Sequence, residues 1–176
     1  MKKRLTVFAF ALMSLATAPF AVAADMPQPG SPAPAFSLPN QDGRDTALSD
    51  FTGKWVVLYF YPKDFTTGCS LEAHNFQEDL AEYEKRNAVI LGVSMDSPES
   101  HKSFCAKEGL NFLLLADKDG RVSTLYGSTL SVMGNVLSAR NTFLIGPDGV
   151  IRKTYKNVNP ATHSDELLAD IDALKN

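Results

Sequence analysis

The sequence contains few residues that could hold a metal or build a disulfide framework. Its 176 residues include two cysteines, Cys69 and Cys105, and three histidines, His74, His101 and His163. The histidines are scattered and the cysteines lie far apart in the sequence. No spacing therefore matches a zinc site or a C-x-x-C redox motif. We expect no metal and no cofactor, and we interpret the histidines as surface or structural residues.

The sequence also lacks an excess of positive charge. It has 17 Lys and Arg residues against 20 Asp and Glu residues, which gives a formal net charge of −3. Proteins that bind nucleic acid or anionic membranes through general electrostatics are usually basic. The composition therefore argues against both of these partners.

Residues 1–23 have the layout of a secretory signal peptide: a basic start, an apolar stretch, a proline break and an A-x-A motif at residues 21–23. An uncleaved anchor helix is the alternative. Spanning a bilayer takes about 20 apolar residues, however, and this stretch is shorter. We expect cleavage after Ala23 or Ala24, which leaves one domain over residues 24–176 with no membrane insertion.

The predicted export has consequences for charge and redox state. Removing the three basic residues of the signal leaves 14 Lys and Arg against 20 Asp and Glu, a net charge of −6. We expect the mature protein in an oxidising compartment, the bacterial periplasm. Two cysteines in such a compartment often form a permanent bridge, which is one interpretation of Cys69 and Cys105.

The first two thirds of the domain indicate strands that alternate with helices. Three apolar runs predict buried strands, at residues 55–62, 88–94 and 112–117. Helical spacing and capping residues predict two helices between them, over residues 69–87 and 98–108. A short hairpin that turns at Asp42-Gly43 precedes the first strand.

The C-terminal part predicts an antiparallel pair and a final helix. Residues 141–146 and 149–156 flank Pro147-Asp148-Gly149, which is a strong hairpin signal. Parallel strands joined by helices and followed by an antiparallel pair are typical of a three-layer α/β/α sandwich of the thioredoxin type. We expect this fold, although a fold alone does not supply a function.

The stretch "FTTGCSLEA" places Cys69 at the start of a predicted helix, directly after a buried strand. Unpaired N–H groups and the helix dipole at that end favour negative charge, so they favour thiolate over thiol. Thr66 is one turn before Cys69, close enough for its hydroxyl to share a small ligand with the sulfur. Pro62 can shield such a pocket without adding an N–H donor. A structural cysteine could occupy the same position, so position alone leaves both interpretations open.

The pattern Pro62-x-x-x-Thr66-x-x-Cys69 resembles the peroxiredoxins, most closely their bacterioferritin-comigratory-protein branch, also called PrxQ. The resemblance runs from Gly30 to the final helix, and it includes the stretches "GSPAPAFSLPNQDG", "YFYPKDFTTGCSLEA", "GVSMDSPESHKSF", "LLLADKDGRVSTLYG" and "RNTFLIGPDGVI". It implies a thioredoxin-like fold and thiol-based reduction of hydroperoxides.

The resemblance also implies roles for individual residues. Cys69 would be the peroxidatic cysteine, whose thiolate attacks the O–O bond. Thr66 would hydrogen-bond the peroxide, and Arg140 would stabilise the thiolate and the developing charge. Glu72 would support the arginine, and Pro62 would shield the pocket. Without the resemblance, Arg140 would be interpreted as a solvated surface residue at the start of a strand.

The chain departs from the family pattern at three positions near Cys69. Thr67 stands where the family usually has proline, and Ser70 stands where it has threonine. Both replacements keep a short polar or helix-starting residue, so we expect tuning of the pocket without loss of activity. His74 occupies a position that is cysteine in many relatives. This chain therefore cannot use a cysteine at that position to resolve the oxidised Cys69.

The resemblance implies that Cys105 is the resolving cysteine, because a subset of the branch places its resolving cysteine in this helix. It would form an intramolecular disulfide with Cys69, which a thioredoxin-like or other dithiol reductant would then reduce. An intramolecular bridge permits a monomer. The alternative is a buried apolar thiol, since Phe104 and Leu110 lie beside it and free cysteines are often core residues.

Two other functions remain possible at this point. A thiol–disulfide oxidoreductase on the same fold would normally use C-x-x-C, but Thr66 occupies the first cysteine position of such a motif. A non-catalytic domain could instead hold a permanent Cys69–Cys105 bridge, worth about 3.5 to 4 kcal/mol of stability if it is unstrained. That bridge would explain neither Thr66 nor the proline pattern.

Overall fold

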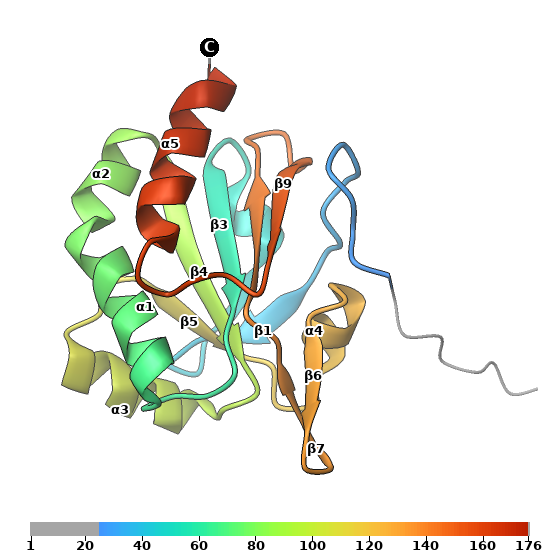
Figure 1. Cartoon of the computed structure of the whole chain (residues 1–176), viewed down its shortest axis with the longest axis vertical. Helices are drawn as coiled ribbons and strands as arrows, with labels where there is room; N and C mark the ends of the chain where they lie inside the picture. Colours follow the sequence, from blue (N-terminus) through green and yellow to red (C-terminus); the bar gives the residue numbers. More distant parts are fainter. Residues whose placement is uncertain (1–24, 176) are drawn as a thin grey trace, which may run out of the picture.

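The computed structural model describes residues 25–175 and shows a three-layer sandwich (Figure 1). The signal peptide predicted for residues 1–23 lies outside the described residues. The central sheet has the order β5-β4-β3-β8-β9, with strands at Trp55–Phe60 (β3), Ala88–Ser94 (β4), Leu113–Ala116 (β5), Asn141–Ile145 (β8) and Ile151–Lys156 (β9). Strands β3, β4 and β5 are parallel, while β8 and β9 pair antiparallel. The thioredoxin-like α/β/α fold predicted from the sequence is confirmed.

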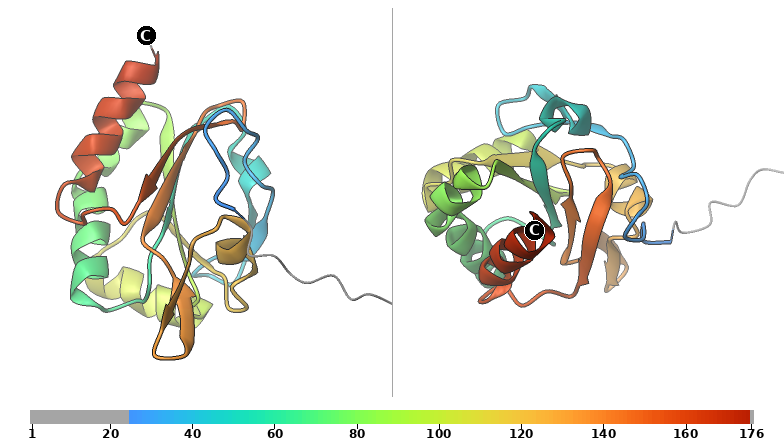
Figure 2. Two further views of the ribbon diagram at one scale, coloured as in Figure 1. Left: turned by 45° about the vertical axis from the view of Figure 1, so that its right-hand side comes forward. Right: turned by 90° about the horizontal axis from the view of Figure 1, so that it is seen from above.

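Helices cover both faces of the sheet (Figure 2). One face packs against α1 (Thr67–Glu78), α2 (Leu80–Lys85), α3 (Pro98–Glu108) and α5 (His163–Lys175). The other face packs against the short helices η1 (Leu48–Phe51) and α4 (Arg121–Leu125), together with the hairpin of β1 (Ser37–Pro39) and β2 (Asp45–Ala47). The helix α1 that carries Cys69 and the helix α3 that carries Cys105 therefore lie in the same layer.

Strand β3 divides the hydrophobic core into two parts. All six of its residues are buried, and successive side chains point to opposite faces. Trp55, Val57 and Tyr59 pack with the helices of the α1 layer, and the residues between them pack on the other side. A central parallel strand that is buried on both faces is a continuous apolar run. This is why the sequence alone predicts β3 correctly.

The single helix predicted over residues 69–87 is wrong, because the chain forms two helices there. α1 ends at Glu78 and α2 begins at Leu80. Asp79 between them has φ −90° and ψ 3°, and its carboxylate accepts a hydrogen bond from Ser164 Oγ at 2.6 Å. Short acidic side chains compete with helical hydrogen bonding. The partner lies in α5, so local spacing could not reveal the break.

The sequence analysis also missed a hairpin that extends away from the central sheet (Figure 1). Strands β6 (Thr129–Val132) and β7 (Asn135–Ser138) pair antiparallel around Met133 and Gly134, which both have positive φ. Two left-handed residues are typical of a tight hairpin turn. Most of its side chains are exposed, and Met133 is 99% exposed. Its apolar residues Leu130, Val132 and Val136 are exposed, so the hairpin lies outside the buried core.

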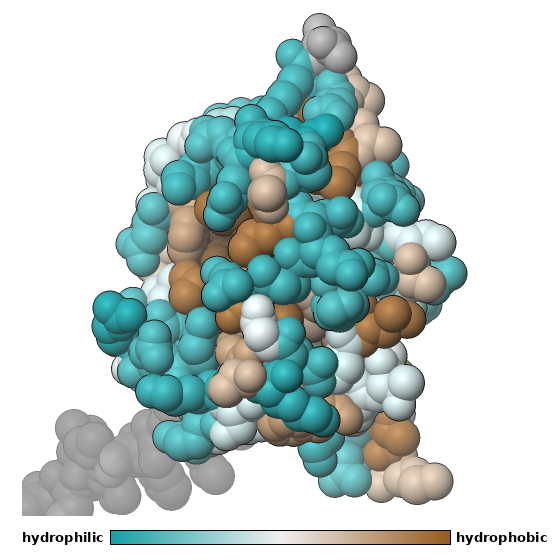
Figure 3. All heavy atoms as spheres, turned by 90° about the vertical axis from the view of Figure 1, so that its left-hand side faces the viewer, coloured by the Kyte–Doolittle hydropathy of each residue, from teal (hydrophilic) through white to brown (hydrophobic). Residues whose placement is uncertain are grey.

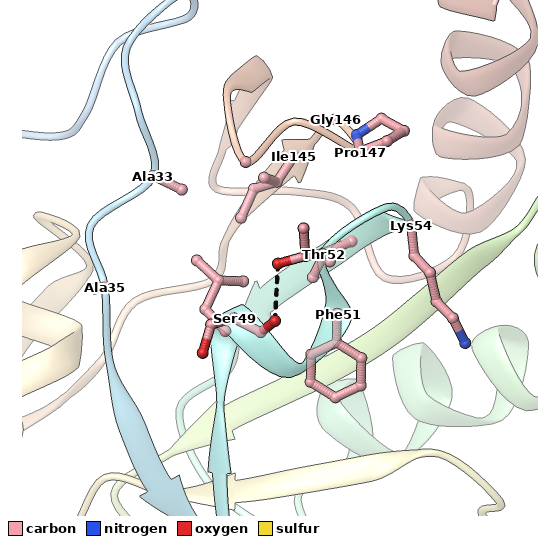
Figure 4. A pocket seen from close by; sticks show the side chains of 12 residues that line it. Ala33, Ala35, Ser49, Phe51, Thr52, Lys54, Ile145, Gly146 and Pro147 are labelled. Atoms are coloured by element: carbon pink, nitrogen blue, oxygen red, sulfur yellow. Dashed lines mark hydrogen bonds between the residues drawn. The ribbon is translucent and has the colours of Figure 1, made fainter.

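Two hollows on the body of the domain are lined mainly by apolar residues. One of about 190 Å³ lies where β3 begins, and Lys54 is its only charged side chain (Figure 4). Another of about 170 Å³ lies between α2 and the starts of β4 and β5, on a face where Figure 3 shows apolar side chains grouped together. Neither hollow is lined by a cysteine. Within residues 25–175, no helix is long and apolar enough to cross a membrane.

Candidate active site

Cys69 lies in the first turn of α1, at the end of the sheet where β3 stops. The chain leaves β3 at Phe60, passes through residues 61–66 and enters α1 at Thr67. Cys69 is 1% exposed. The first N–H groups of a helix have no intrahelical partner, and together with the helix dipole they favour negative charge nearby. The fold therefore buries the sulfur beside the N-terminus of α1.

Thr66 is the residue that precedes α1, one turn before Cys69. Its backbone is extended, with φ −83° and ψ 145°, and its carbonyl accepts from the N–H of Ser70 at 2.9 Å. Its hydroxyl donates to the carbonyl of Lys63 at 3.1 Å. That bond uses the hydroxyl proton and leaves lone pairs on the oxygen. The Thr66 oxygen can therefore accept a further hydrogen bond.

Arg140 reaches Cys69 from the segment just before β8. Its Nη2 is 3.2 Å from Cys69 Sγ, and its Nη1 donates to Glu72 Oε2. Burial opposes the charge of Arg140, but the negative groups at Glu72 and Cys69 outweigh burial and hold the pKa of its guanidinium above the ordinary value. The structure therefore places Arg140 in direct contact with the sulfur.

Glu72 is a buried carboxylate one turn after Cys69 in α1. Burial raises the pKa of Glu72 to about 7, although Arg140 acts in the opposite direction. One carboxylate oxygen contacts Arg140, while the other, Oε1, has no hydrogen-bond partner among the described residues. An ionised carboxylate in this position depends on Arg140 for its compensation. Glu72 and Arg140 consequently form one electrostatic unit beside the sulfur.

Gly68 makes the approach of Arg140 possible, and the sequence analysis did not identify it. A Cβ atom at this position would lie 3.3 Å from Arg140 Nη2. That separation is tighter than ordinary van der Waals contact, so with a side chain here the guanidinium would have to shift by a few tenths of an ångström. The only local signal was a glycine in the first turn of a helix, next to the cysteine.

Pro62 is half-buried and helps to line a hollow beside Arg140. This hollow has a volume of about 290 Å³, and its other lining residues include Leu130, Ala139 and Val158. Most of this lining is apolar, while Arg140 supplies the charge. Proline contributes no N–H that could compete for a bound oxygen. The hollow is therefore a largely apolar depression beside Arg140, the residue that contacts Cys69.

Cys105 lies in α3, and its thiol is free and buried like that of Cys69. Burial raises the pKa of Cys105 to about 11, and the negative charges of Asp64 and Asp42 add to this effect. A thiol with so high a pKa is almost entirely protonated at neutral pH. Cys105 in this conformation is therefore a poor nucleophile.

A hydrogen bond joins the two helices that carry the cysteines. Ser70 Oγ in α1 donates to Glu108 Oε1 at the end of α3, over a distance of 3.0 Å. Ser70 is one of the positions where the chain departs from the family pattern, and a threonine there would also carry a hydroxyl. The first turn of α1 and the last turn of α3 consequently lie against each other.

A buried polar cluster around Asp64 was also missed by the sequence analysis. The carboxylate accepts from Tyr61 Oη at 2.8 Å, Ser100 Oγ at 2.7 Å and His101 Nδ1 at 3.0 Å. Burial opposes its ionisation, but these donors outweigh burial and hold the pKa of Asp64 below its ordinary value. Asp64 belongs to the loop before Cys69, while Ser100 and His101 belong to α3. The cluster therefore connects the segments that carry the two cysteines.

The three histidines do not converge. His74 is exposed and lies 3.2 Å from Glu78, whereas His101 and His163 are buried in separate places. Within residues 25–175, no group of three or more His, Cys, Asp or Glu side chains is arranged to hold a metal ion.

Comparisons with known proteins agree on one family. The AhpC/TSA family model matches residues 29–154. The chain is 42% identical over 146 residues to a Bcp peroxiredoxin of Helicobacter pylori (strain J99), covering 81% of this chain and 96% of that protein. It is 40% identical over 143 residues to peroxiredoxin Bcp of Escherichia coli K12, covering 79% and 92%. Chloroplastic peroxiredoxin Q of Sedum lineare is 40% identical over 147 residues, covering 83% and 78%.

Solved structures give the same result. PrxQ of Xylella fastidiosa superposes with a TM-score of 0.82 at 35% identity, covering 87% of this chain and 99% of that one. A structure of the Xanthomonas campestris bacterioferritin comigratory protein superposes with a TM-score of 0.75 at 36% identity, covering 80% and 92%. That structure was described as a trapped intermediate or ligand complex that bears on alkyl peroxide reduction.

Removing the Arg140 side chain should slow the chemistry of Cys69. Arg140→Ala takes away the one guanidinium that contacts the sulfur, and the loss of such an interaction typically lowers a rate by about 100-fold. The measurement is the second-order rate constant of Cys69 with hydrogen peroxide and with iodoacetamide at pH 7. Arg152→Ala is the matched control, because Arg152 binds Asp148 in the β8–β9 region. Equal rates in both variants would contradict a role for Arg140 in the reactivity of Cys69.

Because of Glu72, the free energy of unfolding should fall as the pH rises. Its folded pKa of about 7 lies above the value of 4.5 for an ordinary glutamate. Between these values the folded state holds a proton that the unfolded state has lost. The free energy of unfolding should therefore fall through this window, by about 3 kcal/mol at most.

Urea unfolding at pH 5 and pH 8 measures this effect. The fall between the two pH values should be smaller in Glu72→Gln than in the unmodified protein. Glu78→Gln is the control, because Glu78 is exposed on the same helix. A Glu72→Gln variant that loses as much stability as the unmodified protein would contradict the prediction.

Proposed function

The chain belongs to the Bcp/PrxQ peroxiredoxins of the AhpC/TSA family, and from this membership we propose the details of its reaction cycle, substrates and location. Peroxiredoxins are thiol-dependent peroxidases, and the chain is such an enzyme. The contact of Arg140 Nη2 with Cys69 Sγ at 3.2 Å, at the start of α1, is the observation that supports Cys69 as the peroxidatic cysteine. Thr66, Arg140, Glu72 and Pro62 would act around it.

In the first step the Cys69 thiolate attacks the terminal oxygen of a hydroperoxide. The S–O bond forms as the O–O bond breaks, so the sulfur is oxidised to a sulfenic acid and the peroxide is reduced. The departing oxygen takes a proton from solvent and leaves as water or an alcohol. Arg140 offsets negative charge on the sulfur and on the separating oxygens. Thr66 accepts the hydrogen bond of the peroxide O–H.

In the second step Cys105 resolves the sulfenic acid within the same chain. The Cys69–Cys105 S–S bond forms while the S–O bond of Cys69 and the S–H bond of Cys105 break, and one water leaves. Both thiols are free in the structure, which corresponds to the reduced state of the proposed cycle. A disulfide needs Cα atoms within about 7 Å. Both thiols are buried and lie on separate helices, so we expect the two helices to open before the sulfurs meet. α1 and α3 would therefore rearrange locally in each cycle.

A dithiol partner closes the cycle by thiol–disulfide exchange. A thioredoxin-like protein would donate two electrons and two protons, leaving both cysteines reduced and its own pair oxidised. Because the resolving cysteine is in the same chain, the cycle is complete in a monomer. The enzyme would serve in antioxidant defence and redox homeostasis.

The substrates are hydrogen peroxide and organic hydroperoxides. The hollow beside Arg140 supports the second class, because Pro62, Leu130 and Val158 give it an apolar wall. An alkyl group could lie against this wall while the peroxide meets Cys69. The Xanthomonas campestris relative, which was studied for alkyl peroxide reduction, supports the same class.

The enzyme is an exported form that acts in the bacterial periplasm. Residues 1–23 carry the features of a cleaved signal, and residues 24–176 make up the peroxiredoxin domain. Periplasmic thiols tend towards oxidation, so the reductant needs electrons from across the inner membrane. A membrane-linked dithiol donor would supply them.

Replacing each cysteine should separate the two steps. Cys69→Ser should abolish peroxide reduction, because Cys69 is the group that accepts the oxygen. Cys105→Ser should consume about one peroxide per chain, stop turning over with a thioredoxin-type donor, and overoxidise at Cys69. Peroxide consumption per thiol lost, together with mass spectrometry of the Cys69 peptide, measures both outcomes.

Two results would contradict the proposed cycle. Substantial thiol-dependent activity in Cys69→Ser would remove Cys69 as the reactive cysteine. Turnover in the peroxide-treated unmodified enzyme without any Cys69–Cys105 linked peptide would make Cys105 a core thiol and the protein a one-cysteine peroxidase.

The proposed export predicts that the mature protein begins at a defined residue. The full-length chain expressed in a Gram-negative host should be recovered from the periplasmic fraction with Ala24 or Asp25 as its first residue. A variant lacking residues 2–23 is the control and should stay in the cytoplasmic fraction. Intact mass spectrometry and fractionation measure both, and an uncleaved chain in the cytoplasm would overturn the proposed location.

A further inference from the structure

The loop before Cys69 is attached to the helix that carries Cys105. The carboxylate of Asp64 in this loop accepts hydrogen bonds from Ser100 Oγ at 2.7 Å and from His101 Nδ1 at 3.0 Å. Ser100 and His101 lie in the first turns of α3. His101 precedes Cys105 by four residues, so the two side chains share one face of the helix. We call these three residues and their hydrogen bonds the Asp64–α3 contact.

The Asp64–α3 contact is costly to open. Asp64 and His101 are buried, and the second ring nitrogen of His101, Nε2, has no partner among the described residues. A carboxylate accepts hydrogen bonds and cannot donate them, so Nδ1 of His101 carries the proton that it shares with Asp64. Movement of the first turns of α3 would leave a buried carboxylate without two of its donors, which is strongly disfavoured. The contact therefore resists unwinding of α3.

A second contact lies on the outside of the same loop. Phe65 is 45% exposed and has φ +62°, a left-handed conformation that bulky side chains rarely adopt. Its ring meets Phe104 edge-on, with 5.2 Å between centroids, and Lys107 Nζ lies 5.4 Å from the ring centre. Phe104 and Lys107 flank Cys105 in α3. The ring of Phe65 thus packs against α3, while the backbone of Phe65 holds a strained conformation.

We propose that the Asp64–α3 contact, supported by Phe65, holds α3 folded in the reduced enzyme and that its opening limits the rate at which Cys105 reaches Cys69. This inference rests on the proposed role of Cys105 as the resolving cysteine. Asp64 and its partners are positioning residues, because none of them touches the reacting sulfur of Cys69 in the structure. While the contact is closed, the sulfenic acid waits and can meet a second peroxide.

The surroundings of Cys105 agree with this order of events. In the folded position burial and the nearby Asp64 charge raise the pKa of the Cys105 thiol to about 11. Opening the contact moves Cys105 into water and away from that charge, and both changes favour the thiolate that attacks a sulfenic acid. The same movement therefore supplies both access and reactivity.

Two serines of α3 provide a matched test. Ser100→Ala removes one donor to Asp64, whereas Ser103→Ala removes a hydroxyl that bonds only to Glu99 O within the same helix. Reduced enzyme is mixed with one equivalent of hydrogen peroxide and quenched at set times. Mass spectrometry then follows the Cys69–Cys105 linked peptide. Ser100→Ala should form it roughly tenfold faster than the unmodified enzyme, and Ser103→Ala at the unmodified rate.

Two further readouts separate this role from a general loss of structure. The rate at which Cys69 consumes the first peroxide should stay the same in both serine variants. Under excess peroxide, Ser100→Ala should accumulate less sulfinic acid at Cys69 than the unmodified enzyme, because resolution competes better with overoxidation. A damaged fold would slow the first step and would not protect Cys69.

Phe65→Asn is a second variant at an exposed position. Asparagine tolerates the left-handed backbone, so the replacement removes the ring without adding strain. It should also speed formation of the linked peptide. Equal rates in Ser100→Ala, Phe65→Asn and Ser103→Ala, or slower disulfide formation in Ser100→Ala, would overturn the proposal while leaving the resolving role of Cys105 intact. Turnover of the unmodified enzyme without a linked peptide would overturn that role, and the proposal with it.

Discussion

The placement of one positive charge, the Arg140 guanidinium, is the constraint on which the active end of this protein depends. Its Nη2 lies 3.2 Å from Cys69 Sγ, and its Nη1 binds the buried Glu72 carboxylate. Charges removed from water need partners, so each of these groups requires the others. Gly68 has no side chain to displace the guanidinium. The start of α1 and the end of the segment before β8 therefore have to meet closely for the thiolate to be stabilised.

The two cysteines have opposite environments on the same layer of helices. Cys69 faces a guanidinium at a helix N-terminus, whereas Cys105 is buried near Asp64 and has its pKa raised to about 11. In the proposed cycle this difference gives the order of the reaction, because one sulfur is reactive in the folded state and the other becomes reactive only after α3 moves. The hydrogen bonds of Asp64 connect the two environments, so local stability and redox chemistry are linked.

Most of the fold could be predicted because its signals are local. The six buried residues of β3 form a continuous apolar run, and Ser97, Pro98 and Gly109 mark the ends of α3 with capping chemistry. The errors occurred at one break within a helix and at one exposed hairpin. At the break Asp79 accepts a hydrogen bond from Ser164 of α5, a partner that is distant in sequence, while the β6–β7 hairpin is mostly exposed and lies outside the buried core.

The sequence by itself determined that Cys69 starts a helix after a buried strand, with Thr66 one turn before it and Pro62 at the head of the loop. These features depend on backbone hydrogen bonding and side-chain periodicity among near neighbours, which adjacent residues encode. Only the tertiary structure decided that Arg140, 71 residues away, contacts the sulfur, and that His101, 37 residues from Asp64, ties the loop to α3. Those pairs form because β8 lies antiparallel to β3 and α3 packs beside α1, and burial then makes each unpaired charge too costly to leave alone.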